Sequence, residues 1–194
     1  MKVLKIFAVI MSMLLLFAAC TPGGENPEEP TEAPAESGST DFSEADLWLE
    51  VSGVKMEVGG KETAFIEALK AAGVEADSVD SISSCMFDGK DNTYHFSFGD
   101  VFTFPLTTDD NTVDEIYGSD ESVKTRGGLG VGSSIEEIIA VFGEGYYMDG
   151  ANLMIYNAEA DAAKNESLPK LYFYIENNVA TGVGLVANLY HVAG

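Results

Sequence analysis

The 194-residue chain contains few basic residues and almost no histidine, cysteine or tryptophan. Ten lysines and arginines, among which Arg126 is the single arginine, stand against 32 acidic residues and give a formal net charge of −22. Because nucleic-acid binding draws most of its affinity from lysine and arginine, this composition excludes a nucleic-acid-binding surface. Two cysteines cannot form a framework of several disulfides, and no cysteine or histidine spacing matches a zinc site. The remaining composition, 46% hydrophobic and 22% charged, is that of a globular protein.

The first 20 residues have the charge pattern and length of a secretory signal. Lys2 and Lys5 precede an apolar stretch over residues 6–17, which is shorter than the ~20 residues that a permanent transmembrane helix needs. The ending FAAC, residues 17–20, resembles the lipobox of bacterial lipoproteins, although phenylalanine stands where leucine is usual. The resemblance implies a signal peptide over 1–19 and covalent acyl chains such as palmitate on Cys20.

Cleavage before Cys20 removes both signal lysines and no acidic residue. The mature chain then has eight basic against 32 acidic residues, a net charge of −24. Anionic headgroups repel such a surface, so we expect the lipid on Cys20 to hold the chain on the extracytoplasmic face of the cell membrane. The lipidated cysteine and a linker rich in proline and glutamate occupy residues 20–46, and the linker cannot form a core.

Residues 47–194 show alternating helical and strand patterns. Helices are predicted over 61–72, ending at Gly73, and over 134–142, with Ser133 as N-cap and Glu136 completing a capping box. Four strands are predicted after each helix, at 79–87, 93–98, 101–106 and 113–118 and at 146–149, 152–157, 170–176 and 179–187.

This pattern predicts an α+β fold with the same plan twice. We expect two tandem αβ repeats, about 54–122 and 123–194, each a short helix packed on antiparallel strands that form a shared or adjoining sheet.

The segment VKTRGGLGVGSSIEEIIAVFG, residues 123–143, combines a glycine-rich turn, a serine at a helix start and Phe-Gly at the helix end. It resembles a motif of the β-lactamase-inhibitor-like lipoproteins and of the small outer-membrane assembly lipoproteins. SCMFDGKD, residues 84–91, is similar to a hairpin of clostridial surface lipoproteins of unassigned function. The resemblance implies two αβ repeats and an antiparallel sheet whose concave face can hold a protein partner. The cross-repeat disulfides of the inhibitor proteins have no counterpart, so inhibitory activity is not carried over.

Candidate catalytic residues are few. If the turn at 88–92 closes symmetrically, Cys85 falls opposite His95, close enough for a thiol–imidazole contact, which leaves a thiol-dependent enzyme as one alternative. The competing interpretation is that Cys85 is a small buried apolar residue, because no third orienting group is identifiable. His191 lies near the chain end. We expect no catalytic residue.

No cofactor or metal is expected either. The acidic pairs Asp88/Asp91 and Asp109/Asp110 lack the spacing of a calcium loop and suit tight turns. The glycine-rich turn before the second helix lacks the Lys-Ser/Thr pair of a phosphate-binding loop.

Aromatic residues carry the functional prediction, because one thin sheet and two short helices cannot hide all their rings. In Tyr172-Phe173-Tyr174 rings point to both faces of a strand. We predict that an exposed aromatic sheet face binds a protein or polymer partner, with Tyr147, Tyr156, Tyr172 and Tyr174 as candidate contacts. Two alternatives remain: the rings all belong to the core, or the chain is a structural scaffold in envelope assembly.

Overall fold

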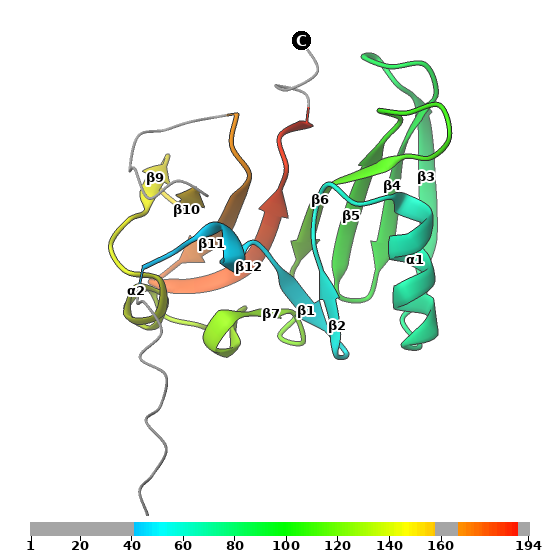
Figure 1. Cartoon of the computed structure of the whole chain (residues 1–194). Helices are drawn as coiled ribbons and strands as arrows, with labels where there is room; N and C mark the ends of the chain where they lie inside the picture. The colour runs from blue at the N-terminus through cyan, green and yellow to red at the C-terminus, as the bar shows by residue number, and fades with distance from the viewer. Residues whose placement is uncertain (1–40, 158–166, 190–194) are drawn as a thin grey trace, which may run out of the picture. The chain divides into compact units, whose positions relative to one another are not determined.

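The computed structural model describes residues 41–157 and 167–189, all within one compact unit (Figure 1). The predicted signal peptide, Cys20, most of the linker and His191 lie outside these residues. The described part is mostly antiparallel sheet with two α-helices, which confirms the α+β class. None of its helices is long and apolar enough to cross a membrane.

Eight antiparallel strands form a large sheet in the order β3-β4-β5-β6-β12-β11-β10-β9. The strands are β3 (Ser78–Ser83), β4 (Lys90–Phe96), β5 (Gly99–Phe104), β6 (Thr112–Gly118), β9 (Tyr147–Asp149), β10 (Leu153–Asn157), β11 (Lys170–Glu176) and β12 (Val179–Val186). β3 to β6 form one meander and β9 to β12 another, and the two meet where β6 pairs with β12. All eight predicted strands are present, because each carries the two-residue period of a strand.

The hairpin between β3 and β4 corrects the predicted register. His95 pairs with Ser78 and Lys90 with Ser83, so the turn occupies residues 84–89 and Cys85 lies inside it. The N–H of Ser84 donates to the carbonyl of Gly89 at 3.1 Å, and the Ser84 hydroxyl accepts the N–H of the turn residue Phe87. Local hydrogen bonds of this serine therefore close the turn earlier than the Asp-Gly-Lys-Asp-Asn stretch suggested.

A small second sheet was not predicted. It has the order β2-β1-β7-β8, with β1 (Leu49–Val51), β2 (Val54–Met56), β7 (Lys124–Thr125) and β8 (Leu129–Gly130). Strands of two or three residues are too short to show alternation in the sequence. Leu49, Val51 and Met56 nevertheless belong to the buried core.

The helices are α1 (Glu62–Ala71) and α2 (Ile135–Phe142), close to the predicted ranges. The N-cap of α2 is Ser134, one residue later than predicted: its hydroxyl accepts the N–H of Glu137, whose carboxylate accepts the N–H of Ser134. The hydroxyl of Ser133 accepts the N–H of Gly130 instead and closes the glycine-rich turn. The motif thus starts a helix, with its two serines in different roles.

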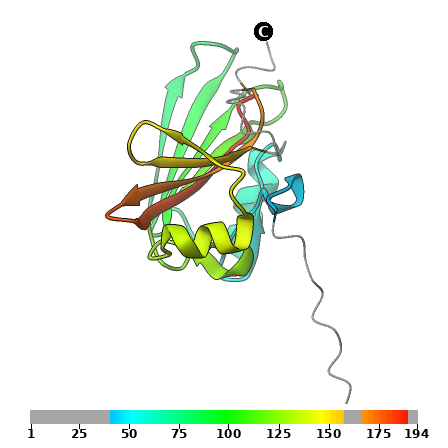
Figure 2. The same ribbon diagram turned by 90° about the vertical axis from the view of Figure 1, so that its left-hand side faces the viewer.

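Both helices pack on the same face of the large sheet, which we call the covered face (Figure 2). The carboxylate of Glu62 in α1 accepts hydrogen bonds from Tyr94 at 2.6 Å, from Asn92 and from Thr103. Tyr94 begins a row of paired residues that crosses the sheet to Tyr156, whose ring contacts Phe142 of α2. Paired residues of adjacent strands point to one face, so α1 and α2 cover one layer.

The folded unit begins before the predicted boundary at residue 47. A 3-10 helix, η1 (Glu44–Asp46), follows Phe42, whose ring lies 5.5 Å from Phe142 and whose N–H donates to the Phe142 carbonyl at 2.9 Å. Residues 41–46, predicted as linker, are therefore part of the domain. Burial of one large ring among other rings outweighs the polar composition around it.

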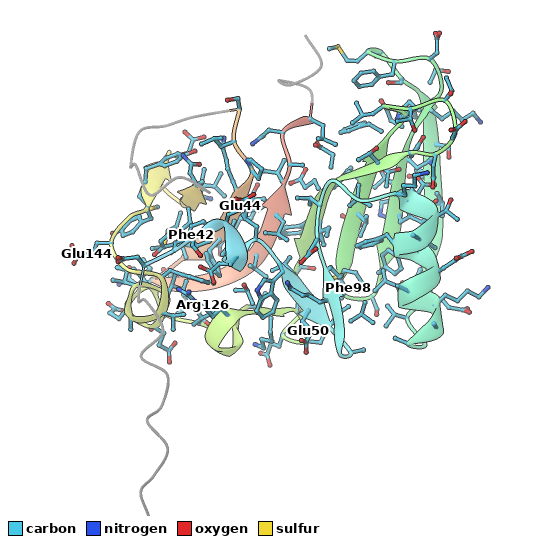
Figure 3. All side chains as sticks on the ribbon, viewed as in Figure 1. Phe42, Glu44, Glu50, Phe98, Arg126 and Glu144 are labelled. Carbon is cyan, nitrogen blue, oxygen red and sulfur yellow. The ribbon has the colours of Figure 1, made fainter. Side chains whose placement is uncertain are left out.

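Arg126 joins this N-terminal segment to α2. It lies in the 3-10 helix η2 (Arg126–Gly128) and is labelled in Figure 3. Its guanidinium contacts the buried Asp46 carboxylate at 2.9 Å and the Val141 carbonyl at 2.7 Å. The same guanidinium lies 4.8 Å from the centre of the Phe142 ring. The single arginine of the chain thus has a structural position.

Candidate binding site on the open sheet face

The face of the large sheet opposite α1 and α2, which we call the open face, carries the candidate site. One row of paired residues on this face runs across the sheet: His95, Asp100, Tyr117, Gly184, Tyr172, Ile155 and Tyr147. The next row contains Phe102, Glu115, Val186 and Lys170. Aromatic and acidic side chains therefore alternate on β5 and β6, whereas β12 contributes Gly184 and Val186.

A hollow of about 350 Å³ lies in the middle of the open face. Its lining is aromatic and acidic and comes from β5, β6 and β11: Asp100, Phe102, Glu115, Tyr117, Tyr172 and Tyr174. The hollow therefore spans the junction between the two meanders.

Two glycines of β12 make room for the rings that form this hollow. A Cβ atom on Gly184 would lie 2.2 Å from Cζ of Tyr172, and one on Gly182 would lie 2.7 Å from the Tyr117 hydroxyl oxygen. Both rings therefore lie across β12 where any side chain would stand. Tyr174 meets both rings edge-on, with centroid distances of 5.8 Å to Tyr117 and 5.7 Å to Tyr172.

Glu115 places a carboxylate beneath the rings. The hydroxyl of Tyr172 donates to Oε1 of Glu115 at 2.5 Å. Loss of water around Glu115 raises the pKa of its carboxyl, and the nearby Asp114 raises it further, against the opposing effect of the Tyr172 hydrogen bond. Burial, followed by the Glu115 charge, raises the pKa of Tyr172. Tyr172 therefore keeps its proton and remains a donor to Glu115.

Asp100 supplies the second carboxylate, at the β5 edge of the hollow. Its Oδ1 lies 2.7 Å from Nδ1 of His95, and Nε2 of His95 lies 3.3 Å from Asp80. Hydrogen bonds to Asp100 and then to Asp80 raise the pKa of His95. The imidazole is thus held between two carboxylates, and it is not paired with Cys85 as the thiol-dependent alternative required.

The predicted contact residues have different positions. Tyr172 and Tyr174 line the hollow. Tyr147 lies in the same row as Tyr172 but on β9, four strands from Tyr117, and is half-buried. Tyr156 is a correction: its side chain is fully buried on the covered face, and its hydroxyl donates to the Gly143 carbonyl at 2.9 Å. A partner cannot reach it, because Phe42 and Phe142 pack against its ring.

Sequence reasoning missed the residues that complete the hollow: Asp100, Phe102, Glu115, Tyr117, Gly182 and Gly184. One signal was available, since Glu115 and Tyr117 are two residues apart in a predicted strand and so share a face. Gly182 and Gly184 show the same spacing in another predicted strand. The antiparallel pairing of these two strands is a tertiary feature.

The remaining candidates are structural or isolated. Cys85 is exposed in the β3–β4 turn. Asp110, for which only a tight-turn role was expected, also accepts hydrogen bonds from the N–H and hydroxyl of Thr63 in the first turn of α1. Across residues 41–157 and 167–189, no three histidine, cysteine or acidic side chains are grouped as metal ligands.

The geometry can bind a ligand that offers hydrogen-bond donors and an edge or face for tyrosine rings. Comparisons of the chain with protein-family models, with curated proteins and with solved structures found no match.

Proposed function

We propose that this chain is a non-catalytic lipoprotein, anchored to the extracytoplasmic face of the cell membrane through Cys20, which binds a protein partner through the open face of its large sheet. The observation that carries the proposal is the hollow lined by four rings and two carboxylates on the face that neither α-helix covers. Aromatic residues at the centre of a surface are the usual anchors of protein interfaces.

The form of the hollow favours a protein over a small molecule. It is shallow, and Tyr174, one of its walls, is 39% exposed. Small-molecule sites normally enclose most of their ligand, whereas a protein partner can cover an open surface and insert one side chain into it.

We also propose that the two meanders belong to tandem αβ repeats, about 54–122 and 123–194, as the resemblance to the β-lactamase-inhibitor-like lipoproteins implies. In support, α1 precedes β3 to β6 and α2 precedes β9 to β12, and the strand order is symmetric about the β6–β12 pair. In this arrangement the binding hollow lies at the junction of the repeats.

Site-specific photo-crosslinking in the native cell tests the binding proposal. A benzophenone amino acid in place of Tyr174 should give one discrete cross-linked protein, identified by mass spectrometry. The matched control is the same amino acid in place of Glu67, which is exposed on α1. An identical product from both positions, or none from Tyr174, would contradict docking on the open face. Products consisting only of other envelope lipoproteins would favour the scaffold alternative.

Metabolic labelling tests the anchor separately. Radioactive palmitate should enter the chain and should be lost completely in Cys20→Ser, which also releases the chain from membranes. Labelling that persists in Cys20→Ser would contradict attachment at this residue.

A further inference from the structure

The chemistry of the hollow indicates a cationic ligand. We propose that it binds the side chain of an arginine residue on the partner protein. This inference rests on the proposed function of the open face as a docking surface and names the group that the surface recognises.

Each of the two carboxylates in the hollow has one oxygen that accepts no hydrogen bond from the described residues. Oε1 of Glu115 accepts the Tyr172 hydroxyl and Oδ1 of Asp100 is bonded to His95, whereas no hydrogen bond to the second oxygen of either group comes from the described residues. A guanidinium has five N–H donors and no acceptor, so it can supply a donor to both. Both carboxylates would repel a ligand group that brings only acceptors.

The aromatic lining of the hollow also suits a guanidinium. Tyr117, Tyr172 and Tyr174 present ring edges and faces around the carboxylates, and Phe102 closes the side formed by β5. A guanidinium stacks on such rings and is attracted by their negative faces. Burial of Glu115 away from water raises the pKa of its carboxyl. The same burial strengthens the attraction between the ionised carboxylate and a cation that enters the hollow.

The spacing of Asp100 and Glu115 favours arginine over lysine. Asp100 pairs with Tyr117 and Glu115 with Phe102, so the two carboxylates occupy diagonal positions on β5 and β6. Diagonal positions on adjacent strands are about 7–8 Å apart, a separation that suits the planar fork of arginine better than the compact ammonium group of lysine. Lys170 lies in the Glu115 row but two strands away, on β11.

The net charge of the whole chain also favours a basic partner. With a net charge of −22, the chain attracts basic partners over long range and repels acidic ones. A basic protein that inserts an arginine into the hollow is therefore the occupant that both the local and the overall charge favour.

The test is an NMR titration of the mature chain, residues 20–194, with acetyl-Gly-Arg-Gly-amide. The amide signals of Gly182 and Gly184 report on the hollow, because both glycines lie under its rings. The Arg peptide should shift these signals with saturation in the millimolar range. The same peptide with citrulline, which is planar but uncharged, should bind about tenfold more weakly, the loss of one charge-assisted hydrogen bond.

Two variants make the result specific to the site. Glu115→Gln keeps an acceptor for Tyr172 and should weaken binding of the arginine peptide about tenfold. Glu67→Gln on α1 should leave binding of this peptide unchanged. An unchanged spectrum outside the hollow shows that Glu115→Gln is folded. Equal binding of the citrulline peptide, no shift at all, or full binding by Glu115→Gln would each overturn the inference.

The two proposals fail separately. If no arginine peptide binds but Tyr174 still cross-links to one protein, the arginine site is wrong and the docking face stands. If the peptide binds but no protein cross-links from Tyr174, the hollow binds arginine, and both the docking of a protein on the open face and the assignment of the arginine to a partner protein are wrong.

Discussion

On the covered face of the large sheet Tyr156 is fully buried, and on the open face Tyr172 is 7% exposed, so two tyrosines of adjacent strands are almost equally hidden. Their surroundings differ. Phe42 and Phe142, from other elements, close over Tyr156, and its hydroxyl finds a backbone carbonyl. Tyr172 is hidden by lying against a glycine of its own sheet, and its hydroxyl finds a carboxylate. Burial of Tyr156 therefore identifies a core residue, whereas burial of Tyr172 identifies a residue of the binding surface.

The largest expected effect is on the covered face. Tyr156→Ala should lower the free energy of unfolding by about 3–5 kcal/mol, because it leaves a cavity among packed rings. Urea denaturation measures it. If the protein does not fold, Tyr156→Phe, which removes only the hydroxyl, should lose about 1 kcal/mol. A loss below about 1 kcal/mol in Tyr156→Ala would contradict a closed core.

The next effect concerns the segment that closes the covered face. Arg126→Ala should cost about 2–4 kcal/mol, because it leaves the buried Asp46 carboxylate without its cation. Lys55→Ala is the control, since the Lys55–Glu57 pair is exposed and should contribute at most about 0.5 kcal/mol. Equal losses in the two variants, measured by thermal unfolding, would argue against residues 41–46 as part of the core.

Gly184→Ala should affect the open face alone. The new methyl group would displace the Tyr172 ring, at a cost of about 1–3 kcal/mol, and should abolish binding of the arginine peptide. Gly60→Ala is the matched control, because nothing lies within 4 Å of its added Cβ. If Gly184→Ala keeps full peptide binding, the position of the Tyr172 ring does not matter to the site.

Glu115→Gln should stabilise the protein at neutral pH by a smaller amount. The pKa of Glu115 is raised in the folded state, so its ionised form is less favourable there than in the unfolded chain. The cost is present in full above the folded pKa and disappears as the pH falls below the unfolded pKa. The gain in Tm over wild type should therefore vanish in acid. A variant less stable than wild type at pH 7 would contradict this sign.

Tyr174→Ala should have the smallest effect on stability, under about 1 kcal/mol, because its ring is 39% exposed. The same change should measurably weaken binding of the arginine peptide in the NMR titration. This variant and Tyr156→Ala remove the same group from opposite faces. Similar losses of stability in both would remove the distinction between core and binding surface.

Local patterns predicted the elements well and their partners poorly. The 3.6-residue period around Phe65 and Ile138 and the two-residue period around Phe173 depend on neighbours in the chain, so both helices and all eight strands of the large sheet could be predicted. The position of Cys85 could not, because the hydrogen bonds of Ser84 close the β3–β4 turn early, so that Ser78 and not Cys85 lies opposite His95.

The candidate site shows the same division. Alternation within one strand establishes that Tyr172 and Tyr174 share a face and that Phe173 has the other. Which face the helices cover depends on packing between distant segments, and this placed Tyr156 in the core. Likewise, Glu115 and Tyr172 are 57 residues apart and meet only through the pairing of β6 and β11 with β12.

The sequence by itself determined the α+β class, the acidic charge and the alternation of side chains along each strand, since these depend on composition and on residues a few positions apart. Only the tertiary structure decided that the two meanders join at β6 and β12, that Phe42 and Arg126 seal the covered face, and that two glycines open a hollow under tyrosine rings. These features arise from contacts between residues far apart in the chain, whose energies depend on the complete packing of the core.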